Sequence, residues 1–205
     1  MSDHDDSSLA GPAIDDHSLS RLMSAADAAD DPVFEWDPEP TDAAPPAEPV
    51  AALTIVDRRG ILGALHHLCA SSRSAGQGCA LMVTVDGLVP LARERGTQVA
   101  DRVRDEAYTR VSARMADASA AGLIDDEMLL MLFDDAEPER AVAHFMGGRE
   151  DAGRIRLGDQ RFAVGFSAAV TEIRRDDLPE AIVGRLCRAL QRVMMSGSDQ
   201  VEQAT

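Results

Sequence analysis

The chain has 205 residues, 45% of them hydrophobic, with 20 arginines, no lysine and a formal net charge of −16 at pH 7. This acidic balance argues against a surface for nucleic acid or for an anionic membrane, since both attract cationic patches. The lack of lysine excludes any mechanism that requires a catalytic lysine.

Cysteine usage and the N-terminus indicate the compartment. Cys69, Cys79 and Cys187 show no CxxC spacing, which favours neutral thiols in a reducing environment. The N-terminus is acidic and has no apolar core, so no signal peptide is expected. No apolar run approaches the roughly 20 residues that cross a bilayer. We therefore expect a cytoplasmic protein with no membrane span and no nucleic-acid partner.

Residues 1–50 differ in composition from the rest. They hold 10 Asp, 3 Glu and one Arg, and so carry −12 of the net charge, and they end in DPEPTDAAPPAEPV. Such a segment buries too little apolar surface to offset the entropy lost on ordering, which predicts a disordered acidic tail rich in Pro and Ala. Phe34 and Trp36 are candidate anchors for an unidentified protein partner. The alternative is a tail that only increases solubility.

The remainder, residues 51–197, is expected to form one compact domain, followed by a flexible C-terminus at 198–205. Apolar spacing predicts a helix over 54–74, a buried strand over 79–86, and helical sequence over 88–118 with a break near Pro90 and Gly96. The second half predicts, in order, a hairpin of strands 120–124 and 128–133, a helix over 137–148 stopped by two glycines, two strands around Gly158–Asp159 within 154–170, and an amphipathic helix over 178–195. This order predicts an α/β protein, in the form of an α+β mixed sheet covered by helices.

The stretch LIDDEMLLML (123–132) places three acidic residues between two apolar runs, and it is similar to the signature GGDEFxxLL. Other segments follow in the matching order and almost without gaps. VDRRG (56–60) is similar to a helix start with NRR, LMVTVDGL (81–88) to a strand ending in DxDxF, ERGTQVADRV (94–103) to xxGHxxGDxxL, and RFAVGFSAAV (161–170) to a late core strand. Over about residues 52–196 the chain therefore resembles the GGDEF domain of bacterial diguanylate cyclases, which have a nucleotidyl cyclase-like fold.

The resemblance implies an active site that this chain has largely lost. The family joins two GTP molecules across a dimer, using a magnesium pair between a strand aspartate and the acidic turn. The family's first aspartate, lysine, asparagine, two turn glycines and closing aromatic correspond here to Thr84, Val89, Ala92, Ile124, Asp125 and Met128. A β-branched residue resists positive φ, and a carboxylate in the turn repels a triphosphate.

Four acidic positions are retained. Asp126 and Glu127 remain in the turn, while Asp86 and Asp101 correspond to a residual nucleotide pocket. We therefore expect a degenerate domain with no catalytic residue, no metal and no cofactor, in which the carboxylates of the turn only shape it.

A ligand site is suggested by RMAD (114–117), which resembles the RxxD motif at which many family members bind cyclic di-GMP, although the spacing to the signature is one residue longer here. Arg114 can grip a phosphate or a guanine edge, and Asp117 can accept from guanine nitrogens. The alternative is a surface ion pair that contributes little. Three further arginines are candidates to complete the site: Arg140, Arg149 and Arg154.

Three functions remain open from the sequence. The first is a catalytically inactive signalling module that binds cyclic di-GMP as a receptor or effector and acts through protein partners. The second is an adaptor that binds proteins independently of any nucleotide. The third is a weakly active cyclase that uses Asp86, Asp126 and Glu127.

Overall fold

The computed structural model describes residues 53–71, 78–125, 127–174, 176–197 and 199–204. The predicted acidic tail, including Phe34 and Trp36, and the turn residue Asp126 lie outside these ranges. None of the helices in the described part of the chain is long and apolar enough to cross a membrane.

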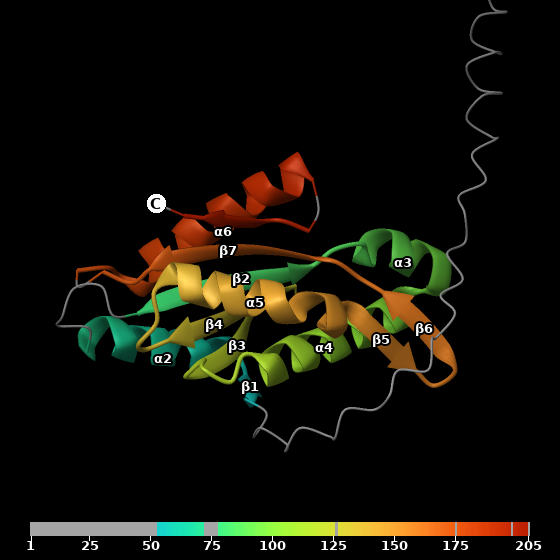
Figure 1. Cartoon of the computed structure of the whole chain (residues 1–205), viewed down its shortest axis with the longest axis horizontal. Helices are drawn as coiled ribbons and strands as arrows, with labels where there is room; N and C mark the ends of the chain where they lie inside the picture. Colours follow the sequence, from blue (N-terminus) through green and yellow to red (C-terminus); the bar gives the residue numbers. More distant parts are fainter. Residues whose placement is uncertain (1–52, 72–77, 126, 175, 198, 205) are drawn as a thin grey trace, which may run out of the picture. The chain divides into compact units, whose positions relative to one another are not determined.

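Helices and strands are interspersed along the described chain (Figure 1). Their order is β1 (Ile55–Val56), α2 (Arg58–Ser71), β2 (Cys79–Val85), α3 (Leu88–Arg95), α4 (Thr97–Arg114), β3 (Ala120–Asp125), β4 (Met128–Phe133), α5 (Pro138–Gly153), β5 (Arg154–Leu157), β6 (Gln160–Ala163), β7 (Phe166–Glu172), α6 (Pro179–Ser196) and β8 (Val201–Gln203).

The strands form one mixed sheet in the order β1-β3-β4-β2-β7-β8, while β5 and β6 pair as a separate hairpin. Each pair of neighbouring inner strands is antiparallel. The short edge strands β1 and β8 lie parallel to their neighbours β3 and β7. The predicted fold class, a mixed sheet covered by helices, is confirmed.

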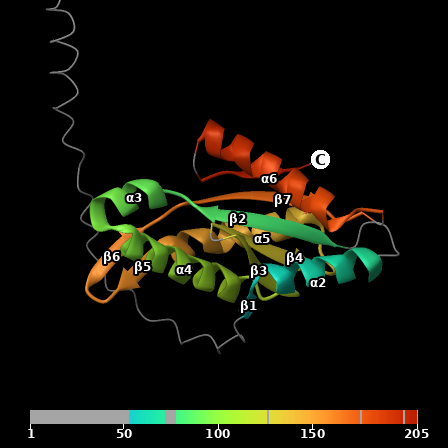
Figure 2. The ribbon, with the colours of Figure 1, turned by 180° about the vertical axis from the view of Figure 1, so that it is seen from behind.

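Both faces of the sheet are covered, as the alternation along β2 shows. Cys79, Leu81 and Val83 contribute to a core beneath α4 and α5, whereas Ala80 and Met82 contribute to a core beneath α2 and α6. All seven residues of β2 are buried, which explains why six of them are apolar and Thr84 is the one polar residue. Figure 2 shows α2 and α6 on their face of the sheet, seen from behind.

Several predicted element boundaries differ from the structure. The helix expected from residue 54 begins at Arg58, because residues 55 and 56 pair with β3 as β1. The helical segment after β2 breaks at Gly96, where φ is +91°, and not at Pro90, which lies in the first turn of α3. A proline is tolerated there because N–H groups of the first turn have no helical acceptor.

Two further expectations about the second half are wrong. The helix α5 continues through Gly147 and Gly148 to Gly153. Phe145 before these glycines and Ala152 after them are anchored in the core, and this packing outweighs the low helix propensity of glycine. The segment 154–170 contains three strands rather than two, because β7 leaves the β5–β6 hairpin to join the main sheet.

The expectation of a flexible end at 198–205 is wrong for Val201–Gln203. These residues form β8, which pairs with β7 in the register Ala168↔Val201 to Val170↔Gln203. Strand pairing with a distant part of the chain leaves no periodic signal in three residues, so local sequence did not indicate it.

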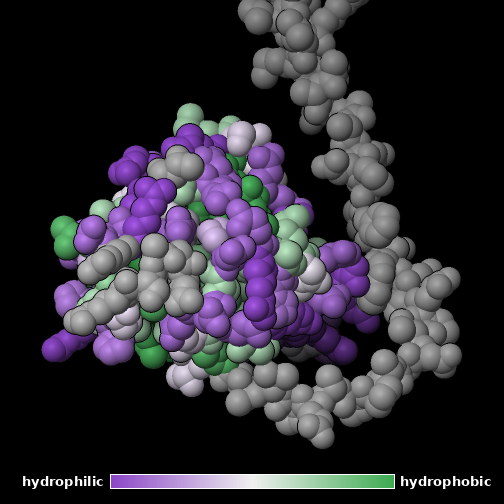
Figure 3. All heavy atoms as spheres, turned by 60° about the vertical axis from the view of Figure 1, so that its left-hand side comes forward, coloured by the Kyte–Doolittle hydropathy of each residue, from purple (hydrophilic) through white to green (hydrophobic). Residues whose placement is uncertain are grey.

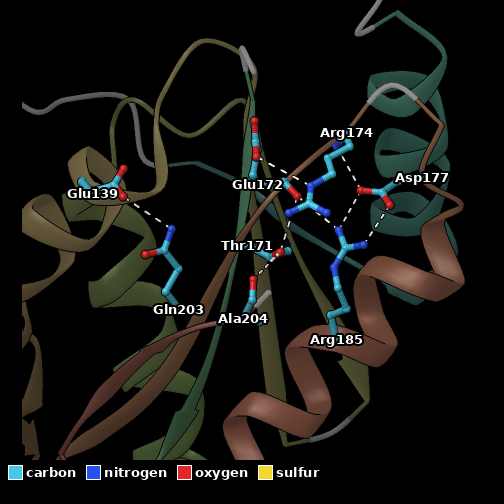
Figure 4. Close-up of polar contacts among 8 residues, drawn as sticks. All are labelled: Glu139, Thr171, Glu172, Arg174, Asp177, Arg185, Gln203 and Ala204. Carbon is cyan, nitrogen blue, oxygen red and sulfur yellow. Dashed lines mark hydrogen bonds and ion pairs between the residues drawn. The ribbon is translucent and has the colours of Figure 1, made fainter. Parts of the chain in front are cut away.

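The connection between β7 and α6 is tied down by one ion pair. Arg185 donates to both carboxylate oxygens of Asp177 at 2.8 and 2.7 Å and to the carbonyl of Glu172 at 3.2 Å (Figure 4). This hydrogen bonding from Arg185 is the main reason why the pKa of Asp177 lies below its ordinary value. The pair holds the first turns of α6 against the end of the sheet.

The surface is mainly polar. Figure 3 shows hydrophilic residues predominating, with apolar ones scattered between them. Of the large apolar side chains that are exposed in the described part, Val56, Val89 and Met146 lie singly on β1, α3 and α5, while Leu178, Met194 and Met195 lie at the two ends of α6. Isolated apolar residues are normal on a protein surface.

Candidate functional site

The acidic turn between β3 and β4 is the first part of the candidate site. The pairing register shifts between Leu123 and Asp125, which marks an irregularity just before the turn. A carboxylate oxygen of Asp125 accepts a hydrogen bond from the backbone N–H of Glu127 at 2.9 Å. This contact across two residues is the local turn chemistry in which aspartate is favoured. Asp125 therefore shapes the turn with its own side chain.

Two buried hydroxyls hold the same carbonyl of this turn. Thr84, in β2, is 7% exposed, and its hydroxyl donates to the carbonyl oxygen of Glu127 at 3.1 Å. The hydroxyl of Tyr108, in α4, donates to that carbonyl as well and lies 3.5 Å from the carbonyl oxygen of Val83. Burial raises the pKa of Tyr108 above its ordinary value, so it stays protonated and can donate. The turn is thereby tied to β2 and α4 at once.

Sequence reasoning did not identify Tyr108. The available signal was weak: it is the only tyrosine of the chain and follows Ala107 in an apolar helical pattern. A buried tyrosine usually needs a partner for its hydroxyl. Which partner it finds is decided by how α4 crosses the sheet.

Three other residues that differ from the GGDEF pattern were traced in the structure, and two of them have structural roles. Ile124 is extended, 4% exposed and part of the core beneath α2 and α6. Val89 is 65% exposed on α3, and nothing in the structure explains its side chain. The carbonyl of Ala92 accepts from the N–H of Gly96 at 2.9 Å and so ends α3.

The two retained aspartates outside the turn have separate partners. Asp86 follows β2, and its carboxylate accepts from the hydroxyl of Ser167 at 3.0 Å and from the backbone N–H of Asp199 at 2.9 Å. Asp101 lies on α4 with its side chain 56% exposed, and it forms an ion pair with Arg104 at 3.0 Å.

The described side chains at this place do not fit, as metal ligands, the magnesium pair that the resemblance to GGDEF cyclases implies. Thr84 supplies a hydroxyl whose proton is directed at a carbonyl, and Asp86 is already used by two donors. Among the described residues, which exclude Asp126, no three His, Cys, Asp or Glu side chains lie close enough together to hold a metal ion. Magnesium needs several oxygen ligands in octahedral geometry.

The two residues of the RxxD-like motif do not share a partner. Arg114 ends α4, and its guanidinium lies 4.0 Å from the carboxylate of Asp151 and donates to the carbonyl of Arg110 at 3.4 Å. Its aliphatic part runs beside Gly148 of α5, where a methyl group would approach the Arg114 Cδ to 3.0 Å. Arg114 is therefore packed lengthwise against α5.

Asp117 lies in the turn after α4 and faces the first half of α5. It accepts from Arg140 at 3.1 Å and lies 3.4 Å from Nδ1 of His144. Arg140 and His144 both contact Asp117, whereas Arg114 contacts α5 separately, at Gly148 and Asp151. We name Arg114, Asp117, Arg140 and His144 together the α4–α5 polar cluster; the four side chains are between 38% and 68% exposed.

Of the three additional arginines, Arg140 pairs with Asp117, and Arg154 lies 3.9 Å from Asp151, the carboxylate that Arg114 also approaches. Arg149 pairs with Asp199 at 2.8 Å, and Arg154 pairs with Glu150 at 2.5 Å.

The cysteines carry no reactive signature. Cys69 and Cys79 are buried, Cys187 is half-buried, and all three are free thiols. Burial raises the pKa of Cys79 to about 12, and burial also raises the pKa of the other two. Protonated thiols are poor nucleophiles and poor metal ligands, so they act as packing residues.

Comparison with known proteins identifies structures that share this fold. Neither a protein-family model nor a curated protein sequence matches the chain. Solved structures do match. The diguanylate cyclase SiaD of Pseudomonas aeruginosa, in complex with its activator SiaC, aligns with a TM-score of 0.66 and 21% identity over 92% of this chain and 68% of that one.

Two isolated domains align over nearly their whole length. The GGDEF domain of DgcB from Caulobacter crescentus, in complex with c-di-GMP, has a TM-score of 0.64 and 15% identity over 82% of this chain and 98% of that one. The active GGEEF domain of a diguanylate cyclase from Vibrio cholerae has a TM-score of 0.64 and 15% identity over 74% and 99%. The likeness shows a shared fold.

Proposed function

Starting from the premise that the described chain has the GGDEF-domain fold, we propose that it is a catalytically inactive signalling module of the cytoplasm. The observation that carries this proposal is the pair of hydroxyls, from Thr84 and Tyr108, on the carbonyl of Glu127. In a cyclase of this fold a strand carboxylate and the acidic turn hold metal ions between them. Here the strand residue is a neutral hydroxyl that donates to the backbone of the turn, so the strand offers no carboxylate to hold an ion.

The turn itself adds to this proposal. A buried isoleucine occupies the position where a glycine would let the backbone approach phosphates, and Asp125 adds negative charge beside it. Phosphoryl transfer depends on positioning and on neutralising the charge of the triphosphate. A turn that excludes the phosphates removes both contributions.

Catalysis is tested directly by product formation. We expect the full chain, incubated with GTP and either Mg²⁺ or Mn²⁺, to form no cyclic di-GMP above a blank without protein, as measured by chromatography. An active GGEEF-containing cyclase assayed in parallel is the positive control. Product at a rate that scales with protein concentration would overturn the inactive assignment and favour a residual cyclase.

The proposed ligand is cyclic di-GMP, at the α4–α5 polar cluster. The ligand carries two phosphates and two guanines, and the cluster offers two arginines, one histidine and one carboxylate on an accessible surface. Arg140, with 68% of its side chain exposed, is free to swing from Asp117 to a phosphate. Asp117 can then accept from a guanine edge. The neighbour DgcB was solved with c-di-GMP, which supports trying this ligand first.

Binding is tested by calorimetric titration with cyclic di-GMP, with GTP as the comparison ligand. We expect micromolar or tighter affinity, weakened about tenfold or more in Arg114→Ala because a charged hydrogen bond is lost. Arg93→Ala, which removes an exposed arginine of α3, is the matched control and should bind normally. Equal affinity in Arg114→Ala and the control would place the ligand elsewhere.

One observation favours the alternative, a nucleotide-independent adaptor. Asp117 already pairs with Arg140 and lies 3.4 Å from Nδ1 of His144 within the domain, so its carboxylate has partners without a ligand. Absence of heat with either nucleotide would support this reading. The search for a protein partner would then turn to Phe34 and Trp36 in the acidic tail and to the domain surface.

A further inference from the structure

The C-terminal segment returns to the sheet after α6 and is fastened at several points. The N–H of Ala168 donates to the carbonyl of Gln200 at 2.9 Å, and the N–H of Ala204 donates to the carbonyl of Val170 at 2.7 Å. Figure 4 shows the far end of this segment, where Thr171 donates to the carbonyl of Ala204 at 3.0 Å and Gln203 reaches Glu139 at 3.4 Å.

This strand is a weak element by itself. β8 has three residues, none of them fully buried, and its apolar contribution is limited to Val201 and the following Ala204. Short edge strands with little apolar burial open at low free-energy cost. Specific side-chain contacts are therefore needed to hold the segment in place.

Asp86 and Arg149 supply these contacts at the entry to β8. The carboxylate of Asp86 accepts the backbone N–H of Asp199 at 2.9 Å and is itself positioned by the hydroxyl of Ser167, which is fully buried. Arg149 of α5 lies 2.8 Å from both the carbonyl oxygen and a carboxylate oxygen of Asp199. Asp199 has φ of +66°, a left-handed conformation that few residues other than glycine adopt, although aspartate does so more readily than most.

We propose that β8 is a displaceable strap on the edge of β7 and that Asp86 and Arg149 form its latch. The latch residue Asp86 lies at the end of β2, at the position that belongs to the nucleotide pocket in cyclases of this fold. Any group that engages the Asp86 carboxylate competes with the Asp199 N–H and loosens the strap. By thermodynamic reciprocity, displacement of the strap frees Asp86.

Release has a defined consequence for the sheet. β8 covers the outer edge of β7, whose residues Phe166 to Thr171 are buried. Without β8, the backbone groups of β7 that now bond to Gln200 and Ala204 would face solvent. An uncovered edge strand of this kind is able to pair with an extended segment of another chain.

Native-state hydrogen exchange of the full chain, measured by NMR, tests the latch. In Asp86→Ala we expect the amides of Ala168 and Ala204 to exchange about tenfold or more faster, because a hydrogen bond to a charged acceptor is lost. The amide of Leu81, in the central strand β2, reports global unfolding and should change less. Asp101→Ala, which removes an exposed aspartate of α4, is the control and should leave the Ala168 and Ala204 amides unchanged.

A second variant tests the same latch in case Asp86→Ala does not fold. Arg149→Ala removes the other half of the latch from α5 and should accelerate the same two amides. Unchanged exchange in both variants would show that backbone pairing alone holds β8. Acceleration that is equal at Leu81 would show a loss of global stability in place of strap release. Either result overturns the proposal.

Discussion

Replacing Thr84 with aspartate, the residue that an active cyclase has at this position, is expected to lower the free energy of unfolding by about 2 to 4 kcal/mol. Thr84 is 7% exposed, and its hydroxyl donates to the carbonyl of Glu127. An ionised carboxylate has no proton to donate, so two acceptors would face each other in a buried setting. A buried charge without a full set of partners costs several kcal/mol.

Two control variants separate the causes in urea denaturation at pH 7. Thr84→Ser keeps the hydroxyl and should cost about 1 kcal/mol for the lost methyl group. Thr84→Val keeps the shape and loses the hydrogen bond, at a cost of about 1 to 2 kcal/mol. If Thr84→Asp is as stable as the natural chain, the site tolerates a carboxylate. The proposal that a structural hydrogen bond of Thr84 has taken the place of a metal-binding carboxylate would then lose its main support.

Replacing Gly122 with alanine is expected to cost about 3 kcal/mol, at the upper range for overpacking a core. A Cβ at this position of β3 would lie 2.6 Å from the Cβ of Ile61 and 2.9 Å from the carbonyl oxygen of Val56. Neither is the end of a flexible side chain, so α2 and β1 must both shift. The measurement is the midpoint and slope of urea unfolding.

Gly63 offers a matched control for this prediction. It lies within α2, where an added Cβ meets no atom within 4 Å. Gly63→Ala is therefore expected to stabilise the protein by about 0.5 to 1 kcal/mol through improved helix propensity. Equal effects of the two substitutions would mean that β3 and α2 are not packed as closely as described.

Local sequence indicated most of the helices and strands, but not the short edge strands β1 and β8, which depend on pairing with β3 and β7. The largely apolar sequence of β2 and the helical spacing of apolar residues in α4 and α6 can be recognised in the sequence, because they involve only residues near one another in the chain. The spacing of the motifs also identified Thr84 and Ile124 as residues that differ from the GGDEF pattern, because that comparison needs only the order of residues. The amphipathic α6 and the β3–β4 hairpin were predicted close to their observed bounds.

Tertiary structure alone decided what the polar side chains do. Tyr108 reaches a carbonyl 19 residues away, Arg140 reaches a carboxylate 23 residues away, and Asp86 accepts from an amide 113 residues away. Such pairs depend on how helices cross the sheet and on which strand lies at its edge, and neither is encoded by neighbouring residues. The sequence therefore determined which residues differ from the GGDEF pattern, and the packing decided that Asp86 accepts the amide of Asp199 at the entry to β8.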